Sequence, residues 1–245
     1  MPDLAQAAES LGVPLTPDQI DLFRHYTDLL LAANQRMNLT ALRDEDALTL
    51  RYHLDALALL PIIAQAAGLT PDELRRGAWR AADVGSGGGA PAIPLAIAWP
   101  GLRYALIESI AKKARFLEDA ARALHLPLTV INARAEEVGR DPVHREAYDL
   151  VTARAVAALP ALVELTLPLA RVGGLAVYPK GPRAQEEADA ARRAIELLGG
   201  ELLGVEEIVV PDVEEARFAV VVRKIAPTPA RYPRRPGLPV KRPLT

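Results

Sequence analysis

The chain of 245 residues contains no cysteine, which excludes disulfide bonds, zinc–thiolate sites and a cysteine nucleophile. Aromatic residues make up only 4%, so we expect a helix-rich, aliphatic core of alanine, leucine and valine. From the sequence, we expect no apolar run long enough to span a membrane. The first residues also lack the pattern of a signal peptide. The formal net charge of −2 does not indicate general nucleic-acid binding. We therefore expect a cytoplasmic monomer with no membrane association.

Acidic residues are absent from residues 223–245, whereas seven Lys or Arg and six Pro are present. Proline lacks an N–H donor and fixes φ, so we predict an extended basic tail, neither helix nor central strand. Such a tail either neutralises phosphates of RNA or only solubilises the terminus. The RNA-binding candidates are Arg231, Arg234, Arg235, Lys241 and Arg242.

The spacing of apolar residues predicts three regions: a helical extension (1–75), an α/β domain (76–226) and the tail (227–245). Thr16-Pro17-Asp18-Gln19 is typical of a helix start, and a second helix is expected from Asp44 to Pro61. Strands are expected at 79–84, 104–108, 128–132, 148–153, 174–179, 203–210 and 217–224. Helices are expected at 91–99, 110–124, 158–170 and 183–198. This alternation predicts a Rossmann-like, seven-stranded, mostly parallel sheet whose last strand is antiparallel.

A glycine-rich loop, residues 83–89 (Asp-Val-Gly-Ser-Gly-Gly-Gly), joins the first strand to the first helix of the α/β region. Glycine permits a sharp turn and close approach of a ligand, here Gly85 and Gly87. The spacing is not that of a dinucleotide site, and Asp83 would repel a pyrophosphate but suit a cationic, amine-bearing cofactor. The pattern favours S-adenosylmethionine, although a ligand-free turn is the plain alternative.

Other candidates lie where strands end, because ligands bind there in open α/β sheets. Glu108, followed by Ser109, would accept the ribose hydroxyls or else cap the next helix. Ala135 and Glu136 would line an adenine pocket or form a solvated turn.

Two basic candidates follow later strands. Arg154 would grip a carboxylate or RNA in a fork geometry, or be a surface arginine. Lys180 would touch a phosphate or be solvated. No metal-binding cluster is apparent.

These motifs resemble the bacterial ribosomal RNA small-subunit methyltransferase G family, also called glucose-inhibited division protein B. The matching segments are 37–40 (Met-Asn-Leu-Thr), 54–57 (Leu-Asp-Ala-Leu), 83–89, 134–136 (Arg-Ala-Glu), 149–156 (Asp-Leu-Val-Thr-Ala-Arg-Ala-Val), 180–181 (Lys-Gly) and 232–237 (Tyr-Pro-Arg-Arg-Pro-Gly). The resemblance implies a class I methyltransferase that uses S-adenosylmethionine to methylate guanine N7 in 16S ribosomal RNA or the small subunit. It also implies that Gly85, Ala90, Ala135, Glu136 and Arg154 contact the cofactor.

The chain departs from the family pattern at two places. Ala90-Pro91-Ala92 stands where the family usually has Phe-Pro-Gly, so position 90 offers no aromatic ring. Arg51-Tyr52-His53 precedes Asp55-Ala56 where Arg-His-x-x-Asp-Ser is expected. Moving a side chain by one helical position rotates it by about 100°.

Guanine N7 carries a lone pair at neutral pH, so positioning alone would suffice for catalysis. We expect Arg154, Asn38 and Lys180 to seat the nucleotide. A small-molecule methyltransferase on the same fold and a non-catalytic RNA-binding ribosome assembly factor are the alternatives.

Overall fold

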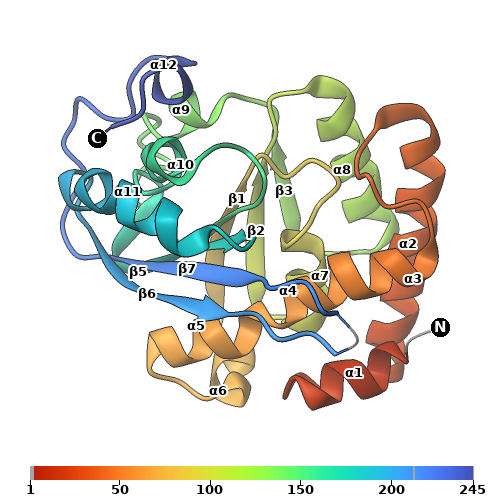
Figure 1. Ribbon diagram of the computed structural model, residues 1–245. Helices are drawn as coiled ribbons and strands as arrows, with labels where there is room; N and C mark the ends of the chain where they lie inside the picture. The colour runs from red at the N-terminus through yellow and green to blue at the C-terminus, as the bar shows by residue number, and fades with distance from the viewer. Residues whose placement is uncertain (1–2, 212, 245) are drawn as a thin grey trace.

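The computed structural model describes residues 3–211 and 213–244 and contains one seven-stranded sheet in the order β3-β2-β1-β4-β5-β7-β6 (Figure 1). The strands are β1 Trp79–Val84, β2 Leu102–Ile107, β3 Leu128–Ile131, β4 Tyr148–Ala153, β5 Ala170–Lys180, β6 Gly200–Glu207 and β7 Phe218–Lys224. Strands β1 to β5 pair in parallel, whereas β7 is antiparallel to both β5 and β6. This arrangement confirms the predicted mostly parallel sheet with its antiparallel pair at one edge.

The helices that follow the strands cover both faces of the sheet. They are α7 Ala92–Ala98, α8 Ala111–Ala123, α9 Ala135–Val138, α10 Leu159–Thr166 and α11 Ala184–Leu197. Successive strand residues enter opposite cores, because side chains alternate along a strand. Thus Ala81 and Leu150 join one buried cluster, whereas Ala82 and Val151 join the other.

Helix α10 ends at Thr166, so the prediction of a helix to residue 170 was wrong. The following strand starts early and is irregular, because its register against β4 shifts between Tyr148 and Leu150. Gly173 has φ +86°, and a Cβ at Gly174 would lie 2.9 Å from a carbonyl oxygen of β4. The glycine pair therefore lets β5 begin before its regular pairing.

Helix α2 Pro17–Met37 is one of the N-terminal helices that pack on the sheet domain. Its predicted start is confirmed by a capping box between Thr16 and Gln19. Gln19 also donates to the carbonyl of Ile97 at 2.7 Å, and Tyr26 donates to that of Gly88 at 2.6 Å. The other helices of this region are α1 Leu4–Ser10, α3 Glu45–Leu48, the π-helical turn η1 Thr49–Leu54, α4 Asp55–Leu57, α5 Leu59–Ala67 and α6 Pro71–Arg76.

The prediction that the second helix ends at Pro61 was wrong, because α5 continues to Ala67. Proline is tolerated in the first turn of a helix, where its missing N–H has no partner to lose.

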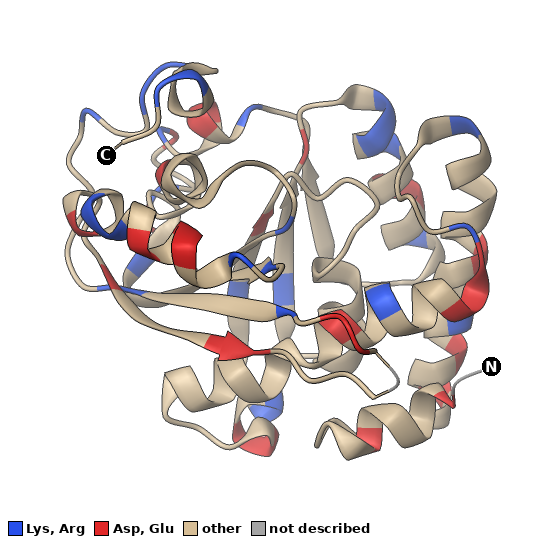
Figure 2. Ribbon diagram, in the orientation of Figure 1, with Lys and Arg blue, Asp and Glu red and all other residues tan. Residues whose placement is uncertain are grey.

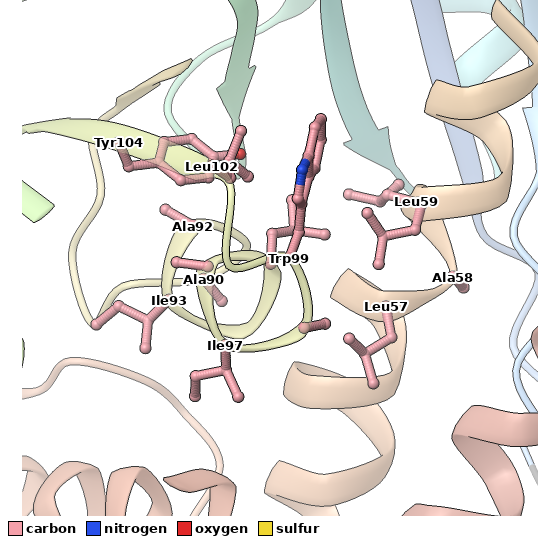
Figure 3. Close-up of a cluster of buried hydrophobic side chains, with 14 of the residues drawn as sticks. Leu57, Ala58, Leu59, Ala90, Ala92, Ile93, Ile97, Trp99, Leu102 and Tyr104 are labelled. Atoms are coloured by element: carbon pink, nitrogen blue, oxygen red, sulfur yellow. The ribbon is translucent and has the colours of Figure 1, made fainter. Parts of the chain in front are cut away.

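The helical run Glu45–Ala67 is long and apolar enough to cross a membrane by length and composition, which corrects the sequence-based expectation. However, 67% of its most apolar window is buried inside the protein. Leu57 and Leu59 pack there with Trp99 (Figure 3), so packing in the core accounts for its apolar character.

The C-terminal segment is folded onto the body rather than extended throughout, and residues 238–241 form the short helix α12 beside α10. Pro239 sits in the first turn of α12, where proline is tolerated. Arginines of the body bind the segment's backbone: Arg140 donates to the carbonyl of Pro233 at 2.8 Å, and Arg145 donates to that of Tyr232 at 2.8 Å. The prediction of an extended tail without helix was therefore wrong at residues 238–241, and composition gave no sign of this docking.

Candidate active site

A cavity of about 330 Å³ opens at the carboxyl ends of β1, β2 and β3. We call it the first cavity. Gly85 has φ +71°, and a Cβ there would lie 2.5 Å from the Val156 side chain. The glycine loop therefore requires a residue without a side chain at this wall. The candidates Gly85, Ser109, Ala135 and Glu136 all line this cavity.

Glu108, also at a strand end, binds backbone groups instead of lying open to the cavity. Its carboxylate accepts the N–H of Gly87 at 3.0 Å and that of Ile110 at 2.8 Å, and the side chain is buried. Ile110 is itself the N-cap residue of α8, and this helix has no side-chain cap hydrogen bond, so the alternative that Glu108 caps the helix is not borne out. The carboxylate instead shapes the glycine loop. Each carboxylate oxygen has a second lone pair, so acceptance of a ribose hydroxyl is compatible with these bonds.

Asp83 is a buried carboxyl group near the end of β1, before the glycines of the loop. Its Oδ1 accepts the Thr152 hydroxyl at 2.7 Å, whereas Oδ2 is buried with no hydrogen-bond partner among the described residues. Burial raises the pKa of Asp83 to about 6, although the Thr152 hydrogen bond opposes the shift. An unpaired buried acceptor is costly, so a bound donor would stabilise this site.

Ala90 does not line the first cavity; it is buried in the core next to Ala92 and Ile93 (Figure 3). Ala92 begins α7 and is fully buried. The residues that depart from the family pattern, Ala90 and Ala92, therefore pack in the core and do not face the first cavity.

The C-terminal segment closes one side of the first cavity, a contact that the sequence analysis missed. Val240 and Lys241 line the cavity, and the N–H of Gly237 donates to Glu136 at 2.7 Å. A backbone contact across 101 positions leaves no periodic signal in the sequence.

A second cavity, of about 390 Å³, lies at the ends of β4 and β5. Arg154 and Lys180, both predicted site residues, line it, and so do Asp55, Glu187 and Arg217. Ala155 lines the second cavity and Val156 the first, so adjacent residues separate the two.

Arg154 is held at the second cavity by the N-terminal region. Its guanidinium lies 4.6 Å from the ring centroid of Tyr52 and donates to the carbonyl of Arg51 at 3.4 Å. It does not line the first cavity, where the resemblance implied a cofactor contact.

Lys180 is paired rather than free. Its ammonium lies 2.9 Å from Glu187 and donates to the carbonyl of Ala157 at 3.1 Å. Only 9% of its side chain is exposed, which differs from the solvated lysine or phosphate contact expected.

Asp55 and Arg217 form an ion pair at the second cavity, each side chain 15% exposed. Asp55 Oδ1 has no hydrogen-bond partner among the described residues. Burial raises the pKa of Asp55, and the charge of Arg217 opposes that shift. In the sequence Asp55 belongs to a segment that matches the family, and no role was predicted for it.

The shifted histidine points into the core. His53 Nε2 lies 2.7 Å from the Thr27 hydroxyl, and burial lowers the pKa of His53 to about 3, so the ring is neutral. Tyr52, one position earlier, contacts Arg154 instead. The side chains of Tyr52 and His53 therefore point in different directions, as expected for adjacent positions of a helix.

Asn38 ends α2 in the left-handed conformation, with φ 46°, and lines neither cavity. The buried Asn34 binds the loop after it, because its side-chain oxygen accepts the N–H of Leu39 at 2.7 Å. Leu39 in turn lies against Gly88.

The five basic candidates all belong to the C-terminal segment, whose ribbon lies at one end of the molecule around α12 (Figures 1 and 2). Arg235, Lys241 and Arg242 are exposed, and Arg231 lies over the Tyr232 ring at 5.1 Å. Arg234 differs, because it pairs with the fully buried Glu164 at 2.6 Å. Its predicted role in binding phosphate is therefore not supported by its position. Residues 3–211 and 213–244 contain no cluster of His, Asp and Glu that could hold a metal ion.

Comparison with known proteins decides the family. Residues 19–214 match the family described as rRNA small subunit methyltransferase G. The chain belongs to this family. A ribosomal RNA small subunit methyltransferase G from Roseiflexus castenholzii is 47% identical over 100% of both chains. The protein of that name from Deinococcus radiodurans is 43% identical over 98% of this chain and 91% of its own.

Solved structures show the same fold at low identity. MtNAS matches with a TM-score of 0.53 and 17% identity over 84% of this chain and 75% of its own. The branched-chain polyamine synthase from Thermus thermophilus matches with a TM-score of 0.51 and 14% identity over 71% of this chain and 57% of its own. The methyltransferase G family membership and the fold together identify the chain as a ribosomal RNA methyltransferase with a class I fold.

Proposed function

We propose that this methyltransferase transfers the methyl group of S-adenosylmethionine to N7 of one guanine in 16S ribosomal RNA. The observation that carries the proposal is the pair of adjoining cavities at the carboxyl ends of the strands. One is walled by the glycine loop, and the other contains the guanidinium groups of Arg154 and Arg217.

The first cavity fits an adenosyl cofactor with a cationic amine. Its volume falls in the range of small-ligand sites. Asp83 is not among the residues that line this cavity, but its buried Oδ2 lacks a partner among the described residues and suits a donor. Gly85 presents only backbone at the cavity wall, because a Cβ there would clash with Val156. When bound, S-adenosylmethionine supplies a methyl group on a cationic sulfur. The residues that would hold it are Asp83, Gly85, Gly87, Glu108, Ser109, Ala135 and Glu136.

The chemistry requires little from acid–base groups, because N7 of guanine already has a lone pair. Rate acceleration then comes from holding N7 in line with the methyl carbon and from excluding water. Arg154 is suited to positioning, since Tyr52 and the Arg51 carbonyl fix its guanidinium. Lys180 would act indirectly, by holding the Ala157 carbonyl and Glu187 in the wall of the second cavity.

Two other functions are the alternatives to this proposal: a small-molecule methyltransferase and a non-catalytic assembly factor. The methyl-transfer experiment distinguishes them. The exposed Arg235, Lys241 and Arg242 beside the first cavity favour an RNA substrate. The monomeric state and cytoplasmic location stay predictions.

The deciding experiment measures transfer of labelled methyl from S-adenosylmethionine to 16S ribosomal RNA and to small subunits that lack this modification. One 7-methylguanosine per RNA, identified by mass spectrometry of nucleosides, is expected. Cofactor binding without transfer to either substrate would favour a small-molecule acceptor. Absence of cofactor binding would favour the assembly factor.

A further inference from the structure

The second cavity contains a carboxylate that the proposed reaction has not used. Asp55 lines this cavity; its Oδ2 pairs with Arg217, and its Oδ1 is buried with no hydrogen-bond partner among the described residues. A buried acceptor without a partner costs free energy that a bound donor recovers. Because Oδ1 has almost no exposed surface, it reaches an occupant of the cavity only when the carboxylate rotates about its Cβ–Cγ bond, which also shifts Oδ2 relative to Arg217.

An occupant of the second cavity would lie next to the first. Ala155 lines one cavity and Val156 the other, at the end of β4. Ala155 has φ 56°, so the chain turns sharply between the two cavities. A base in the cavity that Asp55 lines is thus next to the cofactor site across this turn.

Guanine and adenine differ at the edge that a carboxylate reads best. The Watson–Crick edge of guanine presents two adjacent donors, N1–H and the 2-amino group, whereas adenine presents an acceptor at N1. An ionised carboxylate only accepts hydrogen bonds. Enzymes that modify a base commonly read this edge once the base has left the stack. N7 lies on the other side of the purine, so a carboxylate at N1–H leaves N7 free to face the cofactor.

We propose that Asp55 determines specificity by turning its carboxylate toward the cavity and accepting the N1–H and 2-amino hydrogens of the target guanine, with Arg217 as the neighbouring cation that balances its charge. This inference rests on the proposed function. As the N7–carbon bond forms, the sulfur–carbon bond breaks and its electron pair stays on sulfur, while the guanine ring gains positive charge and no proton moves. A carboxylate at N1–H favours that charge, so Asp55 contributes to kcat as well as to substrate binding.

The test combines an enzyme variant with a substrate variant. Inosine retains N7 and N1–H but lacks the 2-amino group. The substrates are two small subunits reconstituted from 16S ribosomal RNA. The RNA is joined by ligation from pieces, so that the methylated position holds either guanosine or inosine. The wild-type enzyme is expected to prefer guanosine in kcat/KM by roughly 10- to 100-fold. D55N presents an amide N–H₂ toward the 2-amino group, so its preference should fall to about 3-fold or less.

Asp46→Asn is the matched control, because Asp46 is an exposed acid earlier in the same helical run. It should keep the wild-type rate and the wild-type preference. Affinity for S-adenosylhomocysteine and the melting temperature show whether D55N retains the fold. A structural role for Asp55 would lower both rates equally and leave their ratio unchanged.

Two results would overturn the inference: equal rates of wild-type enzyme on inosine and guanosine, or an unchanged preference in D55N. The comparison of inosine with guanosine uses only the wild-type enzyme, so it tests the proposal even where D55N fails to fold. Failure of the wild type to methylate guanine N7 at all would instead overturn the proposed function, and this inference with it.

Discussion

The carboxylate of Glu108 accepts the backbone N–H of Gly87 at 3.0 Å and so joins the end of β2 to the glycine loop after β1. A single buried side chain therefore holds the loop in the shape that leaves the first cavity open. Its second bond, to Ile110, fixes the start of α8 at the same time. The shape of the glycine loop and the position of the Glu108 carboxylate are therefore coupled through this hydrogen bond.

Replacing Glu108 with alanine should weaken cofactor affinity while leaving the protein folded. Removing a charged acceptor from two backbone donors corresponds to a loss of roughly 10- to 100-fold in binding. Calorimetric titration with S-adenosylhomocysteine measures this directly. Glu118→Ala, an exposed acid on α8, is the control and should bind normally. Normal affinity of Glu108→Ala would remove Glu108 from the site.

Asp83→Asn should stabilise the protein above pH 6 but impair cofactor binding. Burial raises the folded-state pKa of Asp83 from 3.8 to about 6, so the folded state binds the proton more tightly than the unfolded state. This carboxyl group therefore lowers stability as the pH rises from about 4 to about 6. The shift corresponds to about 3 kcal/mol, which the uncharged amide would largely recover at pH 8 and not at pH 4. Denaturant unfolding of both proteins at the two pH values checks this, and a gain independent of pH would contradict it.

The sheet was predictable because its signals are local. Parallel strands such as β1, β2 and β4 are short, largely apolar runs, because both faces of the sheet are covered. The Asp-x-Gly-x-Gly-x-Gly sequence begins at the end of β1. Parallel strands bring their carboxyl ends to one edge, which is why Gly85, Ser109, Ala135 and Glu136 meet at one cavity.

The C-terminal docking was not predictable, because its partners are buried groups distant in sequence. Glu164 reads as a polar position on an apolar helix, and only the fold places it against Arg234, 70 positions later. The positive charge of the segment predicted that Arg234 binds RNA phosphates, whereas in the structure Arg234 forms an ion pair with the buried Glu164. Likewise, nothing in the spacing around Asp55 indicates Arg217, which is 162 positions away.

Arg234→Ala should destabilise the protein much more than Arg235→Ala. The guanidinium and backbone N–H of Arg234 both bind Glu164, whose side chain is 0% exposed. Removing one partner leaves a buried charge unpaired, which costs about 3–5 kcal/mol. Arg235 is exposed, and its removal should change the free energy of unfolding by less than about 0.5 kcal/mol. Equal effects in denaturant titrations would show that the Glu164 contact contributes no stability.

Replacing Arg235 and Arg242 together with alanine should weaken RNA binding without weakening cofactor binding. Both side chains are exposed near α12, and neither lines the first cavity. Each lost phosphate contact reduces the slope of log K against log salt by about 0.7 to 0.9, so a change near 1 to 2 is expected for the pair. Filter binding of 16S ribosomal RNA over a salt series measures the slope, and Arg193→Ala on α11 serves as an exposed control. An unchanged slope, with RNA binding otherwise intact, would move the phosphate contacts away from this end of the molecule.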